Sequence, residues 1–170
     1  MFTTNKQKIL IKFIETEPRD WYSLELARGL KISAGSANTL LKELKKEGYL
    51  SSKVIGKTIL YSLASENPVV REFKKLLNVG NAVKDLTLIK KEAGKIILFG
   101  SRSQGTNLPQ SDYDIFVVSD KIGRVRKILM DLKTKEYKDI VMKPEDYLQL
   151  KTADPVLYIE IEKGIIIFEK

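Results

Sequence analysis

The strongest constraint on the fold is the stretch FGSRSQGTNLPQSDYDIFVV, residues 99–118. A short apolar run ends in Gly100-Ser101, a polar loop follows, and a second apolar run begins around Asp112 and Asp114. Because side chains alternate along a strand, these two carboxylates would project from the same face. At a separation of about 4 Å and an effective dielectric constant of about 20, they would repel by roughly 4 kcal/mol. A divalent cation between them would remove that repulsion.

The composition narrows the chemistry that this site can perform. The 170 residues include no cysteine and no histidine, which excludes disulfides, zinc sites built from thiolates or imidazoles, and triads that need an imidazole base. A metal held by carboxylates and water alone is a hard cation, Mg²⁺ or Mn²⁺. The net charge of +8 favours polyanionic partners such as nucleic acid or nucleotide phosphates, although a generally basic proteome would also explain it.

The chain shows no sign of a membrane segment. No apolar stretch approaches the roughly 20 residues that span a bilayer, and the first residues, MFTTNKQKIL, lack the apolar centre and cleavage site of a signal peptide. We therefore expect a cytoplasmic protein with no membrane partner.

The first third of the chain predicts three helices followed by a hairpin. Apolar residues keep helical spacing over residues 4–15, 23–30 and 33–48, with Ser33 as the N-cap of the third helix and Gly48 at its end. Two β-prone runs then meet at Gly56-Lys57, which is typical of a tight turn. This order predicts a winged helix-turn-helix domain over residues 1–66.

The remainder, residues 67–170, predicts an α+β domain. Asn67-Pro68 opens helical sequence that extends to about residue 92, with a break expected at residues 78–81. Short apolar runs at 96–99, 113–118, 140–142 and 165–168 then alternate with helical segments. Such alternation indicates a sheet flanked by helices.

Gly-Ser, ten residues and then Asp-x-Asp at the start of a strand resembles the nucleotidyltransferase superfamily of DNA polymerase β type, and specifically its minimal nucleotidyltransferases. The resemblance covers about residues 69–170, since the ending DPVLYIEIEKGIIIFEK is similar to the helix-then-strand finish of these proteins. It implies a polymerase-β-type domain with a mixed sheet flanked by helices.

The resemblance also implies a site. Its catalytic and metal-binding carboxylates would be Asp112, Asp114 and Asp139, holding two Mg²⁺ ions (or Mn²⁺), with Asp139 also able to accept a hydroxyl proton. The nucleotide, expected to be ATP, would contact Gly100, Ser101 and Arg102. Three alternatives stay open. In the first, Asp139 is a salt-bridged surface residue, and Asp120, Asp131 and Asp146 compete with it for the place of the third carboxylate. In the others, Arg102 is a surface arginine, and Gln104, where many minimal members carry a basic residue, alters the contacts with substrate.

Residues 21–63 resemble winged helix-turn-helix domains of archaeal and bacterial regulators. The resemblance implies binding of double-stranded DNA, with candidate contacts on the third helix and on the hairpin. These candidates are Ser36, Asn38, Thr39, Lys42, Lys45, Lys53 and Lys57. The alternative is a winged helix used for protein contacts or for dimerisation, and a homodimer is itself expected because such domains often bind two half-sites.

The two halves together suggest one biological role. Minimal nucleotidyltransferases resemble the antitoxin partners of HEPN-domain toxins, some of which transfer a nucleotide to a toxin hydroxyl, and antitoxins often repress their own operon. The resemblance thus implies transfer of a nucleoside monophosphate, expected to be AMP, to a protein hydroxyl, with DNA-binding autoregulation. The alternative is a transcriptional regulator whose transferase-like domain is inactive or only senses nucleotide, and a polymerase or tRNA-end-adding enzyme is disfavoured.

Overall fold

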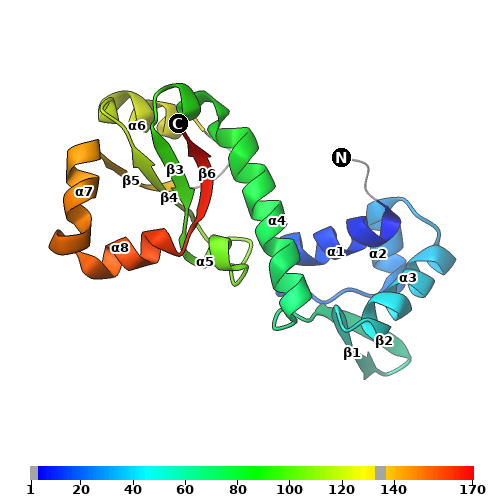
Figure 1. The fold of residues 1–170 in the computed structure, drawn as a ribbon. Helices are drawn as coiled ribbons and strands as arrows, with labels where there is room; N and C mark the ends of the chain where they lie inside the picture. The colour runs from blue at the N-terminus through cyan, green and yellow to red at the C-terminus, as the bar shows by residue number, and fades with distance from the viewer. Residues whose placement is uncertain (1–3, 133–136) are drawn as a thin grey trace. The chain divides into compact units, whose positions relative to one another are not determined.

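The computed structural model describes residues 4–132 and 137–170 and contains two compact units, Met1–Arg71 and Glu72–Lys170 (Figure 1). The boundary between the units lies inside the helix that follows residue 67, whereas the sequence predicts a cut between residues 66 and 67. That cut stays a prediction. No helix in the described part of the chain has both the length and the apolar character needed to cross a bilayer.

Unit 1 is a winged helix, as predicted. Its elements are α1 (Asn5–Thr16), α2 (Ser23–Leu30), α3 (Ala34–Lys46), β1 (Leu50–Ile55) and β2 (Thr58–Leu63), and the two strands pair antiparallel. The Ser33 side chain accepts a hydrogen bond from the backbone N–H of Ser36, which confirms it as the N-cap of α3. Gly56, with φ +59°, makes the predicted hairpin turn.

The core of unit 1 joins the helices to the hairpin. It contains Ile9, Phe13, Trp21, Leu26, Leu41, Leu44, Leu50 and Tyr61. Trp21 and Tyr61 exchange backbone hydrogen bonds of 2.9 and 2.8 Å, so the segment between α1 and α2 is fixed to β2. The hairpin is therefore held by main-chain bonds as well as by apolar packing.

Asp20 adds a polar clamp at the same place. Its carboxylate lies 2.5 Å from Nζ of Lys53 on β1 and accepts a 2.5 Å hydrogen bond from Oγ of Ser62 on β2. Lys53, and then Ser62, lower the pKa of the Asp20 carboxyl below its ordinary value. The side chain of Asp20 is 25% exposed, so the clamp is partly shielded from solvent.

Unit 2 is built on a four-stranded mixed sheet, which confirms the predicted α+β class. The elements in chain order are α4 (Pro68–Asp85), the 3₁₀ helix η1 (Leu86–Lys91), β3 (Lys95–Leu98), α5 (Gly100–Gln104), β4 (Tyr113–Val118), α6 (Ile122–Asp131), β5 (Tyr137–Met142), α7 (Pro144–Ala153), α8 (Pro155–Glu162) and β6 (Ile165–Glu169). The strand order is β5-β4-β3-β6, with β4 and β5 parallel and the other pairs antiparallel. Figure 1 shows helices around this sheet.

Both faces of the sheet carry an apolar cluster. On the first, Ile96 and Ile115 pack with Val125 and Leu129 of α6; we call this the α6 face. On the other, the α8 face, the sheet residues Ile97, Phe116 and Val118 pack with Leu150 of α7 and Ile161 of α8. Because side chains alternate along a strand, these clusters assign the residues of β4 and β5 to one face or the other.

One predicted feature of unit 2 is wrong. The helix was expected to break at residues 78–81, but α4 continues to Asp85. Asn78 is buried within it, and its Nδ2 donates to the carbonyl oxygen of Arg102 at 2.9 Å and to Oδ1 of Asn107 at 2.8 Å. These tertiary hydrogen bonds outweigh the low intrinsic helix propensity of asparagine.

Replacing Asp20 with Asn should lower the free energy of unfolding of unit 1 by about 1 kcal/mol near neutral pH, because one charged hydrogen bond and one ion pair are lost. The pKa of Asp20 is lower in the folded state, so its contribution is complete above the ordinary carboxyl pKa and disappears as the pH falls through the folded value. Urea unfolding followed by the fluorescence of Trp21, the sole tryptophan, measures this. An unchanged midpoint at neutral pH would contradict the clamp.

Candidate functional site

The Gly-Ser motif and the Asp-x-Asp motif lie next to each other in unit 2. Asp114 lies on β4 and, by alternation with Phe116, on the α8 face. The backbone N–H of Phe99 donates to the carbonyl oxygen of Asp114 at 3.0 Å, so the chain leaving β3 passes directly beside this residue. Asp112 precedes Asp114 by two residues and is half-buried, like Asp114.

Gly100 is in contact with the Asp114 carboxylate. Its φ of +66° lies in the left-handed region, and a Cβ at this position would lie 2.4 Å from Oδ2 and 3.1 Å from Cγ of Asp114. A side chain there would force the Asp114 carboxylate to move. The close approach explains why a glycine stands at this point, and it places the start of α5, with Ser101, beside the carboxylate.

The electrostatics of Asp114 favour a bound cation. Burial raises the pKa of the Asp114 carboxyl above its ordinary value, and the nearby Asp112 and Glu160 carboxylates raise it further. The ammonium group of Lys138 acts in the opposite direction. Half-buried carboxylates close enough to repel one another are stabilised by a cation that both can bind.

Arg102 has a different place from the one predicted. It was expected to contact phosphate, but it is only 7% exposed and its guanidinium points into unit 2. Nε donates to the carbonyl oxygens of Ser111 (2.9 Å) and Asp112 (3.1 Å), and NH2 donates to that of Pro109 (3.1 Å). The guanidinium carbon also lies 3.9 Å from the ring centroid of Tyr113. Arg102 therefore holds the loop before β4 in position, and its donors are directed at that loop rather than at a ligand.

Residues of α4 complete this buried network. Oδ1 of Asn78 accepts from NH1 of Arg102 at 3.0 Å, and Nζ of Lys74 donates to the carbonyl oxygen of Asn107 at 3.0 Å. Both Lys74 and Asn78 are at most 5% exposed. The sequence assigns neither residue a role near the site, and the only signal is a lysine and an asparagine four residues apart on one face of a helix.

Asp139 does not join the other two predicted carboxylates. In the parallel pair β4–β5 it lies opposite Ile115, whereas Asp114 lies opposite Lys138. Directly paired residues project from the same face, so the Asp139 side chain belongs to the α6 face. There Oδ2 of Asp139 lies 3.4 Å from Nε of Arg126. This matches the surface salt bridge that the sequence left open as the alternative.

A pocket of about 290 Å³ lies next to Asp114. It is lined by Phe99, Asp114, Lys138, Asp139, Ile140, Leu157 and Glu160. Asp139 borders it even though its carboxylate is paired with Arg126. The pocket combines apolar walls with charges of both signs, which suits a ligand that has an apolar part and an anionic part.

Asp112 and Asp114 are the residues that could hold a metal. Within residues 4–132 and 137–170, no group of three or more acidic side chains is arranged to bind an ion. The two carboxylates nevertheless suit a hard divalent cation, because they supply oxygen ligands, and Asp114 lies directly against Gly100. The remaining ligands of such an ion would come from water and substrate phosphates.

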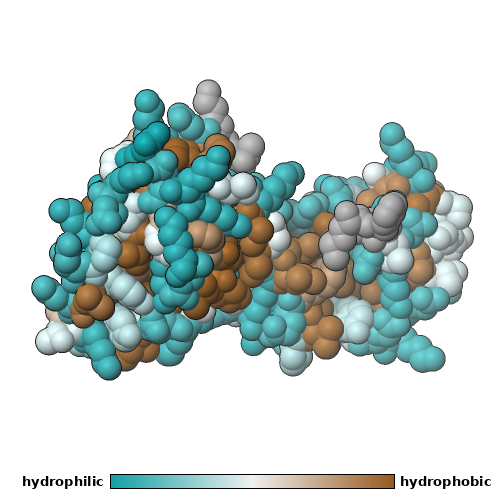
Figure 2. All heavy atoms as spheres, turned by 45° about the horizontal axis from the view of Figure 1, so that its top comes forward, coloured by the Kyte–Doolittle hydropathy of each residue, from teal (hydrophilic) through white to brown (hydrophobic). Residues whose placement is uncertain are grey.

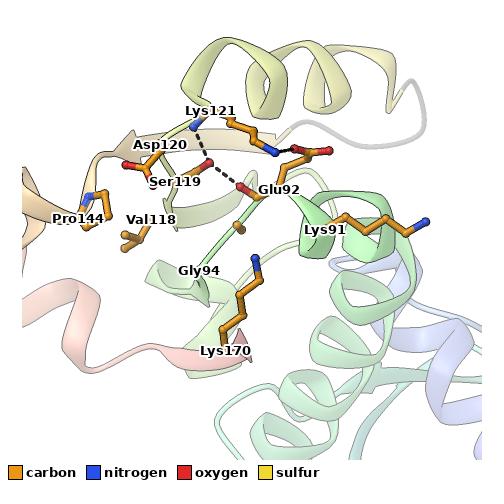
Figure 3. Close-up of a pocket in the computed structure, with 10 residues that line it drawn as sticks. Lys91, Glu92, Gly94, Val118, Ser119, Asp120, Lys121, Pro144 and Lys170 are labelled. Carbon is orange, nitrogen blue, oxygen red and sulfur yellow. Dashed lines mark hydrogen bonds and ion pairs between the residues drawn. The ribbon is translucent and has the colours of Figure 1, made fainter.

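A second pocket, also of about 290 Å³, lies near the end of β4 (Figure 3). Lys91, Lys121 and Lys170 line it together with acidic groups. Its polar groups bind one another: Nζ of Lys121 lies 2.9 Å from Glu92, and Oγ of Ser119 donates to the Glu92 carbonyl oxygen at 2.6 Å. Because these groups are already paired with one another, they are less available to a ligand, and the pocket next to Asp114 is the better candidate for the functional site.

The predicted DNA contacts in unit 1 lie on α3 and on the hairpin. The exposed members are Asn38, Thr39, Lys42, Lys45 and Lys57, while Ser36 is half-buried. Lys53 is 57% exposed but forms the ion pair with Asp20. Lys6 pairs with Glu43 at 3.5 Å and Glu47 at 2.5 Å, so it offsets part of the negative charge at the end of α3, where Lys42, Lys45 and Lys46 outnumber these two carboxylates. On the face that Figure 2 displays, hydrophilic side chains cover much of each unit.

Replacing Gly100 with Ala should displace the Asp114 carboxylate, because the new Cβ would overlap Oδ2 and the residue would keep a positive φ. We expect a loss of about 1–3 kcal/mol in the stability of unit 2, together with weaker Mn²⁺ binding. Gly123→Ala is the matched control, since Gly123 lies in a helix with nothing within 4 Å of an added Cβ. Equal effects of the two substitutions on thermal unfolding and on Mn²⁺ electron paramagnetic resonance would contradict this geometry.

Comparison with known proteins assigns the family. The sequence family described as "Polymerase beta, Nucleotidyltransferase" matches residues 81–170. Among solved structures, a protein of Sulfolobus solfataricus described as a candidate nucleotidyltransferase matches with 15% identity and a TM-score of 0.41, covering 59% of this chain and 88% of that one. TrmBL2, described as an archaeal chromatin protein with a novel mode of DNA binding, matches with 14% identity and a TM-score of 0.35, covering 92% of this chain and 71% of that one. A search of curated proteins found no significant match. On the family match over residues 81–170, which is more than half of its length, the chain belongs to the polymerase β nucleotidyltransferase family.

Proposed function

We propose that the protein transfers a nucleoside monophosphate from a nucleoside triphosphate to a hydroxyl group, in a reaction that depends on Mg²⁺ or Mn²⁺. The observation that carries this proposal is the contact between Gly100 and the carboxylate of Asp114. It joins the motif suited to phosphates to the motif suited to a metal ion. Asp112 and Asp114 are the proposed metal ligands, and Gly100 and Ser101 are the proposed phosphate contacts.

The chemistry is an in-line displacement at the α phosphorus. The acceptor hydroxyl oxygen forms a bond to phosphorus, the bond from phosphorus to the α–β bridging oxygen breaks, and pyrophosphate leaves with that electron pair. The hydroxyl proton is released to water. Bound divalent metal would neutralise charge on the phosphates and lower the pKa of the hydroxyl. The residues of the chain contribute by positioning: Asp114 is fixed by Gly100, and Arg102 fixes the loop that carries Asp112.

We propose AMP as the transferred group and a protein hydroxyl as the acceptor, such as one on a HEPN-type toxin. These choices follow the resemblance of the chain to minimal nucleotidyltransferases. We propose that the site relies on Asp112 and Asp114; Asp139 borders the pocket, but its carboxylate is paired with Arg126.

A second proposed activity is binding of double-stranded DNA by unit 1, for autoregulation. Residues 1–71 contain twelve Lys and Arg against seven Asp and Glu, which is a net charge of +5 out of the +8 of the chain. The exposed Asn38, Thr39, Lys42 and Lys45 on α3 are suited to base edges and phosphates. If the transferase site proves inert, unit 1 would make the protein a DNA-binding regulator that carries a transferase fold.

The nucleotide site is tested by calorimetric titration of a nonhydrolysable ATP analogue with and without Mg²⁺. We expect Mg²⁺-dependent binding by the wild type and a loss of at least tenfold in affinity in the double variant Asp112→Asn/Asp114→Asn, because the metal ligands are removed. Asp146→Asn, an exposed carboxylate on α7, is the matched control. Binding that survives in the double variant would exclude this metal site, and absence of binding by the wild type with any of the four nucleotides would favour the regulator.

The DNA-binding surface is tested by the double variant Lys42→Glu/Lys45→Glu. Reversing two phosphate-facing charges should weaken DNA binding by about 10-fold or more at moderate salt, and it should reduce the dependence of affinity on salt concentration. A variant of equal net charge, Lys8→Glu/Lys127→Glu, should bind DNA nearly as well as the wild type in fluorescence anisotropy. Equal affinities of the two variants would show that α3 does not contact DNA.

A further inference from the structure

The register of β4 and β5 determines which residue of β5 reaches the nucleotidyl site. Asp114 is paired with Lys138, and Phe116 is paired with Ile140. Phe116 and Ile140 both pack in the α8-face cluster, so Lys138 projects from the same face as Asp114. A lysine therefore lies next to the proposed metal ligand, in the adjacent strand.

Asp139 is committed to the opposite face. It lies opposite Ile115, which packs against α6, and its carboxylate pairs with Arg126 of α6. Moving this carboxylate to the metal side would require a one-residue slip of β5, which would also bring Val141 out of its buried place on the α6 face. Apolar packing thus keeps the Asp139 carboxylate on the face opposite Asp114, although the residue borders the pocket.

Lys138 borders the pocket beside Asp114 and is exposed to it. Its positive charge opposes the repulsion among the Asp112, Asp114 and Glu160 carboxylates. In the described part of the chain, no carboxylate lies within ion-pair distance of Nζ of Lys138, whereas Asp139 has such a partner. Nζ is thus available to a ligand that enters the pocket.

We infer that Lys138 is the residue of β5 that acts in the nucleotidyl site, where its ammonium group binds a phosphate oxygen of the nucleoside triphosphate, and that Asp139 instead anchors α6. This inference rests on the proposed function. A primary ammonium is a flexible point charge with three donors, so it can follow a phosphate group on the edge of an open pocket.

The test separates metal binding from nucleotide binding in the full chain. Mn²⁺ binding without nucleotide is measured by electron paramagnetic resonance, and binding of the nonhydrolysable ATP analogue with Mg²⁺ is measured by calorimetry. For Lys138→Ala we expect about a tenfold loss of nucleotide affinity and Mn²⁺ affinity equal to or higher than that of the wild type, because a cation beside the carboxylates is removed. Lys138→Arg should restore most of the nucleotide affinity, and Lys127→Ala is the matched control on α6.

Asp139→Asn should leave Mn²⁺ and nucleotide affinity within about twofold of the wild type. A tenfold loss of Mn²⁺ affinity in Asp139→Asn, or unchanged nucleotide affinity in Lys138→Ala, would overturn the inference while leaving the proposed function in place. A wild-type protein that binds neither Mn²⁺ nor nucleotide would overturn both. Folding of every variant is checked by thermal unfolding, so that a loss of binding is not a loss of structure.

Discussion

The contact between Gly100 and the Asp114 carboxylate constrains the rest of unit 2. Antiparallel pairing places Leu98 opposite Ile115, so the chain that leaves β3 must pass beside Asp114 before α5 begins. A left-handed glycine makes this passage possible, and a Cβ there would overlap the carboxylate. The position of α5, the path of the loop behind it and the orientation of Asp114 therefore depend on one residue that lacks a side chain.

The buried network around Arg102 explains how the loop keeps its conformation. A guanidinium removed from water must be matched by acceptors, and Arg102 finds them in the carbonyl oxygens of Pro109, Ser111 and Asp112 and in Asn78. Burial lowers the pKa of Arg102 below its ordinary value, but the group stays charged at any physiological pH. Because partly satisfied polar networks are costly, a loop that satisfies every partner has few alternative conformations. The loop thus delivers Asp112 to the site in a defined geometry.

Much of this architecture could be predicted from the sequence. The winged helix follows from helical apolar spacing, the Ser33 cap and the turn at Gly56, which are local signals that the structure confirms. The central strand β4 also lies where its apolar run predicts. These features could be found because each depends on contacts between residues that are near in sequence or on a simple periodicity.

The features that could not be predicted depend on tertiary contacts. The continuation of α4 through Asn78 requires partners on Arg102 and Asn107, which are distant in sequence. The face on which Asp139 lies depends on the register of β5 against β4. Because side chains alternate between the two faces of a strand, a motif that identifies the right strand can still place a carboxylate on the wrong face. Lys138 was overlooked for the same reason, although its alternation with Ile140 was a signal available in the sequence.

The carboxylates of Asp112, Asp114 and Glu160 bear on whether unit 2 is catalytically active or has only the fold of a nucleotidyltransferase. Burial and the neighbouring Asp112 and Glu160 carboxylates disfavour the ionised form of Asp114, while the positive charges of Lys138 and Arg102 favour it. Because the folded state raises the pKa of Asp114, its ionised form opposes the folding of unit 2 near neutral pH, which is a loss of stability. A divalent ion that binds the folded state alone would reverse that loss by mass action. Local destabilisation that a ligand relieves is typical of functional sites, and the metal site proposed for Asp112 and Asp114 would be a case of this kind.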